Sequence, residues 1–337
     1  MKFAYLRVHL LAVLGALLSA GPVSADPERS PTEWLDLMNR SFVETSYDGT
    51  FSYFSGDELS TLRVVHTISN GVQRERLVHL NGAPREIVRI GDAVECIMQP
   101  GDEILALESS IPSGPFARAF SRAFEDLSNH YTLSLHGTDR VADRSAIRLA
   151  VMPRDVQRYG FRLWLDEDTG LLLRSELVDI EGTKLEIFQF ATLKVGGPIT
   201  EQDLTPQSGP ESVRSHMSLE PSAPQAQPRA VNWHAEWLPD GFTMASSDIR
   251  RTPSTSKPVA TLMYSDGLAA FSVFIEDMPE AGFSNLVSRI GATVAVSEIV
   301  THGPGNTRHL VTVVGEIPTP TAQRIAQSIR YVSENTP

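Results

Sequence analysis

The sequence has little cysteine, little positive charge and only one long apolar run. A single cysteine, Cys96, occurs among 337 residues, so no disulfide forms within the chain and stability must come from core packing. Cys96 lies in AVECIMQ, which has the pattern of a strand, so we expect a buried small hydrophobic residue there rather than a nucleophile. Lysine and arginine number 29 against 41 aspartate and glutamate residues, which argues against nucleic acid as a partner.

Catalytic signatures are missing as well. The chain contains no H-E-x-x-H, no G-x-S-x-G, no P-loop and no G-x-G-x-x-G. His302 and His309 flank a Gly-Pro-Gly turn, but no carboxylate spacing supports a metal site there. Ser265 beside Asp266 has no histidine at a diagnostic spacing, and turn chemistry already explains the pair. The sequence therefore predicts neither an enzyme nor a cofactor.

The apolar run lies at the N-terminus. Lys2 and Arg7 precede VHLLAVLGALLSAG, and Val23-Ser24-Ala25 offers the small residues that a signal peptidase accepts. We expect residues 1–25 to be a cleaved secretory peptide, which moves the net charge from −12 to −14 because two cations are lost. The alternative, a retained membrane anchor, is disfavoured because the run is short for a membrane span. The mature chain is expected in a periplasm, as a soluble protein.

Strand patterns dominate residues 26–195. A helix is predicted from Pro31, with Ser30 as its cap and Glu33 completing a capping box. Asn70-Gly71 and Asn81-Gly82 then separate alternating runs, which predicts an antiparallel meander. A second helix is predicted in PFARAFSRAFEDLSNH, where three phenylalanines recur at i, i+4 and i+8: Phe116, Phe120 and Phe124.

Composition changes between residues 196 and 229, where proline, serine and glutamine replace apolar residues. Such a stretch buries too little surface to offset its ordering entropy, so we interpret it as a linker. A smaller domain is predicted over residues 230–337. Its expected elements are a hairpin at 262–277, a helix near FSNLVSRIG, two further strands, and a last helix starting at Thr319.

Arginines gather in the hairpin around Asn81-Gly82. A two- or four-residue loop places four of them on one face: Arg74, Arg76, Arg85 and Arg89. Clustered arginines can bind a carboxylate-bearing peptide or lipid phosphates. The alternative is a solvated face of Arg–Glu pairs.

The run FRLWLDEDTGLLLRSELVD predicts a second hairpin with one strongly apolar face. Only two helices are available to cover the long meander, which makes part of that face a candidate open trough for acyl chains or an apolar peptide. Its candidate residues are Leu163, Trp164 and Leu173, together with the helix that carries Phe116, Phe120 and Phe124. Complete coverage by the helices is the alternative.

The hairpin LMYSDGLAAFSVFIED has apolar residues on both faces. Asp266-Gly267 predicts a two-residue type I′ turn. A hairpin that is apolar on both sides must cover two surfaces, and one of them is a candidate partner site. The candidate residues are Tyr264, Ser265, Asp266, Gly267 and Phe274.

Four ordered motifs carry a resemblance to a known family. They are RERLVHLNGAPREIVRIGDAVECI, RLWLDEDTGLLLRSELVDIEG, WLPDGF and LMYSDGLAAFSVFIE. Together they resemble the RseB/MucB family of periplasmic regulators, and the second motif alone is also similar to a hairpin of LolA-type lipoprotein carriers. The resemblance implies an α+β protein, with a large unclosed antiparallel β-barrel, helices in its mouth, and a small α/β C-terminal domain.

The same resemblance implies a function. Family members bind the periplasmic domain of a single-pass anti-sigma factor, of the RseA or MucA type, and shield it from the protease that starts regulated proteolysis. Lipopolysaccharide or other acyl-chain ligands are implied as the signal that lifts this protection. The rival hypotheses are a lipid or lipoprotein carrier without a signalling partner and an uncharacterised hydrolase. Whether the chain forms a homo-oligomer stays open.

Overall fold

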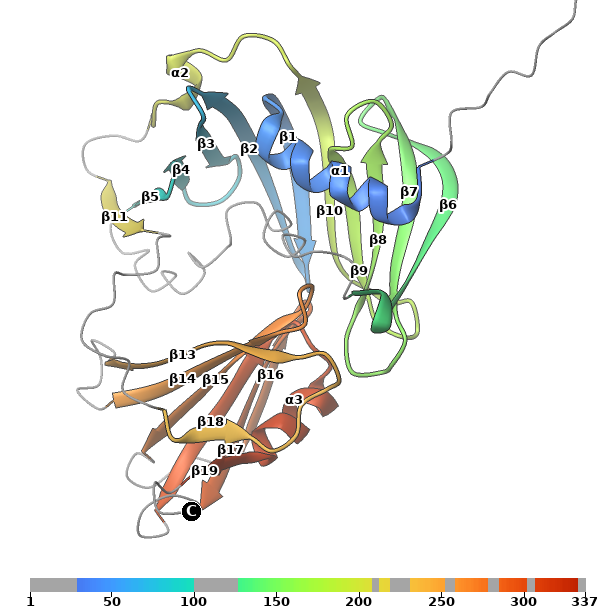
Figure 1. Ribbon diagram of the computed structural model, residues 1–337. Helices are drawn as coiled ribbons and strands as arrows, with labels where there is room; N and C mark the ends of the chain where they lie inside the picture. Colours follow the sequence, from blue (N-terminus) through green and yellow to red (C-terminus); the bar gives the residue numbers. More distant parts are fainter. Residues whose placement is uncertain are drawn as a thin grey trace, which may run out of the picture.

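Two large antiparallel sheets, each in its own domain, dominate the described part of the chain (Figure 1). The computed structural model describes residues 29–99, 127–207, 212–218, 231–251, 258–277, 285–301 and 307–332. Within these ranges, no helix has the length and apolar character that crossing a bilayer requires.

The large domain is built on an eleven-stranded sheet in the order β11-β5-β4-β3-β2-β1-β10-β9-β8-β7-β6. Its strands are β1 (Tyr47–Ser55), β2 (Glu58–Ser69), β3 (Val72–His79), β4 (Glu86–Ile90), β5 (Ala93–Met98), β6 (Tyr131–Val141), β7 (Arg144–Pro153), β8 (Gly160–Asp166), β9 (Leu172–Val178), β10 (Lys184–Val195) and β11 (Val213–Ser218). Strands β11 and β6 form the two edges of this strongly curved sheet. The predicted unclosed barrel is confirmed.

Helix α1 (Pro31–Glu44) lies across one face of the large sheet (Figure 1). The predicted capping box is present, since Glu33 N donates to Ser30 Oγ at 3.3 Å and Ser30 N donates to Glu33 Oε2 at 2.7 Å. Leu35 and Met38 are completely buried against the sheet. The predicted second helix, with Phe116, Phe120 and Phe124, lies outside the described residues, apart from a 3-10 turn at Leu127–Asn129.

Part of the predicted linker folds onto the large domain. Helix α2 (Glu201–Leu204) follows β10, and β11 pairs with β5 from Val213 opposite Met98. Arg74 contacts the Glu201 carboxylate through two hydrogen bonds, of 2.5 and 2.7 Å. These contacts hold the start of the connection against the sheet.

The small domain has a six-stranded sheet in the order β13-β14-β15-β18-β17-β16. Its elements are β12 (Trp233–Ala235), β13 (Thr243–Arg251), β14 (Pro258–Ser265), β15 (Ala270–Asp277), β16 (Leu286–Ile290), β17 (Thr293–Thr301), β18 (Arg308–Gly315), α3 (Thr319–Gln327) and β19 (Ile329–Tyr331). Helix α3 packs against β17 and β18, and β12 pairs with β19.

The helix predicted near FSNLVSRIG is wrong, because Leu286–Ile290 form strand β16. Ile290 pairs with Thr293, so Gly291 and Ala292 form a two-residue turn, and Gly291 has a φ of +58°. A turn that requires positive φ, followed by pairing with β17, outweighs a weak helical spacing of apolar residues.

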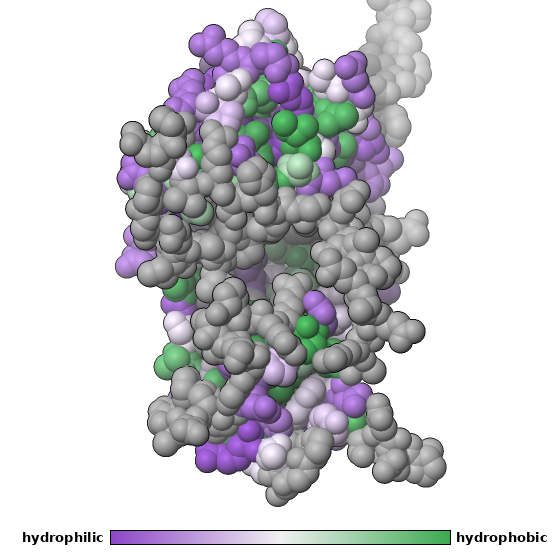
Figure 2. Space-filling view, turned by 90° about the vertical axis from the view of Figure 1, so that its left-hand side faces the viewer, coloured by the Kyte–Doolittle hydropathy of each residue, from purple (hydrophilic) through white to green (hydrophobic). Residues whose placement is uncertain are grey.

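Apolar side chains line the inside of the large domain. On the face seen in Figure 2, hydrophobic side chains gather in the upper half, over this domain, among hydrophilic ones. The buried cluster joins α1 to β1, β2 and β6–β10, and Leu163 lies within it with no exposed surface.

Replacing Leu163 with alanine removes buried methyl groups and leaves a cavity. We expect Leu163→Ala to lower the free energy of unfolding by about 2–5 kcal/mol in denaturant titrations. Leu59, which is 57% exposed on β2, provides the control. We expect Leu59→Ala to change that free energy by less than about 0.5 kcal/mol, and equal effects of both variants would contradict the burial of Leu163.

Candidate functional site

The trough candidates in the described residues belong to the core. Leu163 and Leu173 have no exposed surface and Trp164 is 9% exposed. Trp164 Nε1 donates to Asp139 Oδ2 at 2.9 Å, and the Arg174 guanidinium lies 4.7 Å above the ring. An acyl chain therefore reaches these residues only if neighbouring side chains move, and lipid binding there stays a prediction.

The four arginines do not share a face, contrary to the sequence expectation. Arg74 pairs with Ile90 and Arg76 with Val88, while Arg89 lies opposite Glu75. The hydrogen bond from His79 N to Arg85 O leaves a five-residue loop between them, and an odd loop reverses the face on which the second strand places its side chains. Arg74 and Arg76 thus lie on one face, and Arg85 and Arg89 on the other.

Arg76 is engaged within the chain. It is 3% exposed, and its Nε donates to Glu86 Oε2 at 2.7 Å. Its Nη1 also donates to the carbonyl oxygen of Asp203 in α2, at 3.2 Å. Since Arg74 binds Glu201 next to it, the arginines on this face hold α2. Both form Arg–Glu pairs, as in the alternative, but the Arg76–Glu86 pair is buried and not solvated.

The β14–β15 hairpin turns through four residues instead of the expected two. Ser265 pairs with Ala270, and the Asp266 Oδ1 atom accepts hydrogen bonds from the backbone N–H groups of Leu268 and Ala269. Gly267 has a φ of +102° within this turn. The four-residue turn thus lets the Asp266 carboxylate bind backbone N–H groups within the turn, and these hydrogen bonds fix the carboxylate at the tip of the hairpin.

The two faces of this hairpin differ. Tyr264 is 2% exposed and its ring stacks on Phe271 in the core of the small domain. On the opposite face, Phe274 is half-buried and Met263 is 39% exposed. Of the partner candidates on the strands of this hairpin, Phe274 therefore keeps accessible apolar surface.

A buried ion pair joins the two domains. Arg158, in the loop between β7 and β8, and Asp266 at the hairpin tip both have fully buried side chains. Arg158 Nη1 lies 2.5 Å from Asp266 Oδ2, and Arg158 Nη2 donates to the Asp240 carbonyl oxygen at 2.6 Å. The Tyr131 hydroxyl donates to the same Asp266 oxygen at 2.9 Å, and Asp155 lies 2.9 Å from Arg158 Nη2.

Aromatic rings complete the surroundings of this ion pair. The Arg158 guanidinium carbon lies 5.5 Å from the Tyr131 ring centroid and 5.1 Å from that of Phe242. Burial, and then the negative charge of Asp266, raise the pKa of the Tyr131 phenol, so the hydroxyl stays protonated and keeps donating. The Arg158 charge is thus compensated by carboxylates and ring faces in a site closed to water.

Gly241 allows the domains to approach each other. It has a φ of +86°, and a Cβ atom on it would lie 2.3 Å from His130 Nε2. A larger residue would therefore collide with the large domain and strain the backbone. We call the contact between His130, Tyr131, Asp155 and Arg158 of one domain and Asp240–Phe242 and Asp266 of the other the ionic joint.

A second contact lies at the tips of two hairpins (Figure 1). Ala292 N donates to Glu186 Oε1 at 3.2 Å, and Glu186 also accepts from Tyr53 and Ser55, at 2.6 and 3.1 Å. Ala292 is completely buried within the core cluster of the large domain. Burial, and then Glu186, raise the pKa of the Tyr53 phenol, which therefore remains a donor.

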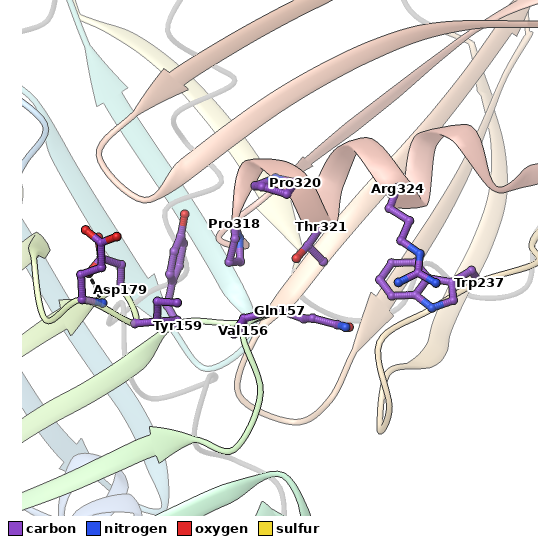
Figure 3. A pocket seen from close by; sticks show the side chains of 11 residues that line it. Val156, Gln157, Tyr159, Asp179, Trp237, Pro318, Pro320, Thr321 and Arg324 are labelled. Atoms are coloured by element: carbon purple, nitrogen blue, oxygen red, sulfur yellow. Dashed lines mark hydrogen bonds between the residues drawn. The ribbon is translucent and has the colours of Figure 1, made fainter.

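An open groove of about 450 Å³ runs between the domains (Figure 3). The large domain contributes Val156, Gln157, Tyr159, Asp179, Ile180 and Glu181, and the small domain contributes Trp237, Pro318, Pro320, Thr321 and Arg324. Val156 and Ile180 are 63% and 57% exposed, and the Arg324 guanidinium lies 3.8 Å from the Trp237 ring centroid. We call this the interdomain groove.

The groove has an exposed apolar rim, whereas Arg158 and Asp266 of the ionic joint are buried and bound to each other. Among the residues that the structure describes, no three His, Cys, Asp or Glu side chains are grouped as metal ligands. Sequence reasoning missed Arg158, Val156 and Ile180, which lie in loops without a strand or helix pattern. The signal that was available is WLPDGF, since it supplies Trp237 to the groove and Asp240–Phe242 to the joint.

Asp266→Asn tests the ionic joint. The variant keeps Oδ1, which accepts the hydrogen bonds of the turn, but replaces Oδ2 with an amide NH₂ group that faces Arg158 and Tyr131. The buried charge of Arg158 then lacks the Asp266 carboxylate. We expect the docked arrangement to lose about 3–5 kcal/mol, and small-angle X-ray scattering to show a larger radius of gyration. Asp143→Asn, at an 83% exposed side chain, is the control. An unchanged scattering curve for Asp266→Asn would contradict the joint.

Comparisons with known proteins place the chain in a family. The profile of the MucB/RseB N-terminal domain matches residues 30–208, and that of the MucB/RseB C-terminal domain matches residues 227–330. The chain is 41% identical to the sigma factor AlgU regulatory protein MucB of Pseudomonas aeruginosa, over 95% of this chain and 96% of that protein. It is 29% identical to the sigma-E factor regulatory protein RseB of Salmonella typhimurium, over 98% of this chain and 99% of that one.

A solved structure agrees with these sequence matches. The crystal structure of MucB in complex with MucA(peri) is similar to this chain with a TM-score of 0.74 and 38% identity, covering 90% of this chain and 100% of the other. Both domains are thus matched in sequence, and most of the chain is matched in fold. The chain belongs to the MucB/RseB family.

Proposed function

We propose that this protein is a negative regulator of an envelope-stress sigma factor. It binds the periplasmic domain of a membrane anti-sigma factor and shields that domain from the first proteolytic cut, so that the sigma factor stays sequestered. The names of the relatives support this role, since MucB and RseB are both called sigma factor regulatory proteins, and MucB has been solved in complex with MucA(peri).

The interdomain groove is the observation that carries the proposal. Val156 lines it from one domain and Trp237 from the other (Figure 3). Ile180 also lines it, and both Val156 and Ile180 are exposed. Large apolar side chains that stay exposed around a groove are typical of protein-binding surfaces. Because the ionic joint fixes both walls, a partner segment can contact the two domains at once without first having to align them.

Location and mode of action follow from the same proposal. We infer that residues 1–25 direct the chain to the periplasm and are removed there, since small residues at Val23 and Ala25 follow a short apolar run. We also infer a role in binding rather than catalysis, which agrees with the relatives being named as regulators.

Release by a lipid signal forms part of the proposal. If the partner weakens the binding of an amphipathic ligand by some factor, the ligand weakens the binding of the partner by the same factor. A ligand that prefers the partner-free protein therefore favours release of the partner. The buried positions of Leu163 and Leu173 mean that such a ligand must open the large-domain core, and this requirement couples lipid binding to a change of shape. A lipid carrier without a signalling partner needs only the large domain, so the docked small domain argues against it.

The groove is tested by placing a charge on its rim. We expect Ile180→Asp and Val156→Asp to weaken binding of the anti-sigma periplasmic domain about tenfold or more, because a carboxylate would be desolvated against apolar partner side chains. Isothermal titration calorimetry gives the affinity, and digestion of the complex with the envelope protease gives the protection.

The control is Leu59→Asp, since Leu59 is as exposed as Ile180 but does not line the groove. We expect this variant to bind like the unmodified chain. Normal affinity and normal protection with both groove variants would contradict the groove as the binding surface.

A further inference from the structure

Strand β16 is an edge strand without the usual protection. It is the last strand of the small-domain sheet, where β17 is its neighbour among the described strands. All five of its residues are exposed, and three of them are large and apolar: Leu286 at 62%, Val287 at 48% and Ile290 at 67%. An edge of this kind presents unpaired backbone N–H and C=O groups next to apolar side chains.

Other edges in the molecule have bulges, which β16 lacks. Strand β13, at the opposite edge of the same sheet, has a bulge between Met244 and Ser246 and carries charged residues such as Asp248. Strand β6, at an edge of the large sheet, has a bulge between Leu135 and Thr138. Bulges and charges prevent another strand from pairing with an edge. Strand β16 has a regular register from Leu286 to Ile290 and one charged residue, Arg289, whose Nε is bound to the carbonyl oxygen of Gly291.

The strand is also held rigidly in place. Asn285, just before it, hydrogen-bonds to the Glu298 carboxylate and accepts from the Ile299 N–H on the neighbouring strand. At its other end the Arg289 Nε donates to the Gly291 carbonyl oxygen at 2.9 Å. A Cβ atom on Gly291 would lie 3.1 Å from Gly56 N of the large domain, so the turn fits closely against that domain. A fixed edge pairs with an extended segment at a low entropic cost.

The position of β16 connects it to the interdomain groove. Tyr159 lines the groove, and although burial raises the pKa of its phenol, the positive charge of Arg289 lowers that pKa. The turn that ends β16 also contacts the large domain directly, since Ala292 N donates to Glu186 Oε1 at 3.2 Å.

We propose that β16 binds an extended segment of the anti-sigma factor's periplasmic domain as an additional, seventh strand of the small-domain sheet. The inference rests on the proposed function and adds the mode of recognition: backbone hydrogen bonds along the edge, with apolar partner side chains beside Leu286, Val287 and Ile290.

The length of the edge favours this occupant over a second copy of the chain. Five residues span about 17 Å, and pairing two such strands buries far less than the roughly 1,200 Å² of a stable protein–protein interface. A partner segment that also occupies the interdomain groove adds the missing area. Backbone pairing also explains shielding, because a segment held as a strand in this sheet cannot enter a protease cleft in extended form.

The experiment compares two double variants of the full mature chain. Leu286→Lys with Ile290→Lys places charges along the edge without touching the ionic joint or the groove. Leu59→Lys with Val72→Lys changes two residues of similar exposure, 57% and 42%, on the large domain. We expect the β16 double variant to bind the anti-sigma periplasmic domain at least tenfold more weakly and the control to change less than threefold, with equal melting temperatures for both.

Hydrogen–deuterium exchange on the unmodified complex gives the second measurement. We expect the backbone amides of residues 286–290 to exchange at least tenfold more slowly when the anti-sigma domain is bound. Normal affinity of the β16 double variant, or unchanged exchange in these residues while the partner binds, overturns strand addition and leaves the proposed function standing. Absence of binding by the unmodified chain overturns both.

Discussion

The charge of Arg158 is the constraint on which the arrangement of this molecule depends. A guanidinium with no exposed surface must be compensated, and here both domains contribute. Asp155 comes from the domain of Arg158, and the Asp266 carboxylate, the Asp240 carbonyl oxygen and the Phe242 ring come from the other domain. Separating the domains therefore requires hydrating that charge again. The joint specifies one orientation, because a wrong orientation leaves the charge buried without its acceptors.

The groove and the placement of the edge strand both depend on that orientation. The groove has one wall from each domain, and β16 meets the large domain through its turn at Gly291. The groove exists only while the two domains are docked, whereas the edge of β16 belongs to the small domain alone. Opening the joint therefore removes the groove and changes the position of β16 relative to the large domain. A partner segment that contacts both surfaces then loses part of its binding site.

Local patterns in the sequence predicted local structure well. The capping box at Ser30 and Glu33 and the antiparallel meander are present, because each depends on residues a few positions apart or on strand alternation. That the sheet is an unclosed barrel was implied by the family resemblance and not by a local pattern. Loop length was harder to predict. A five-residue connection after His79 placed Arg85 and Arg89 on the face opposite to Arg74 and Arg76, and a four-residue turn redirected Asp266.

The site itself depended on contacts that no local pattern encodes. Arg158 lies 108 positions from Asp266, and its loop has no periodicity that indicates burial. The sequence did single out Asp266 and WLPDGF, but as a turn and as a family motif rather than as halves of one contact. The strand character of β16 was missed for the same reason, since it comes from pairing with β17.

The pinning of α2 by Arg74 and Arg76 has a consequence for reversibility. With α2 and β11 fixed to the large sheet, only residues 219–230 separate the last paired residue, Ser218, from the start of the small domain at Val231. Twelve residues reach about 40 Å at full extension, so the length of this connection limits how far apart the two domains can move. Two domains kept within such a distance meet again more readily than two separate molecules do.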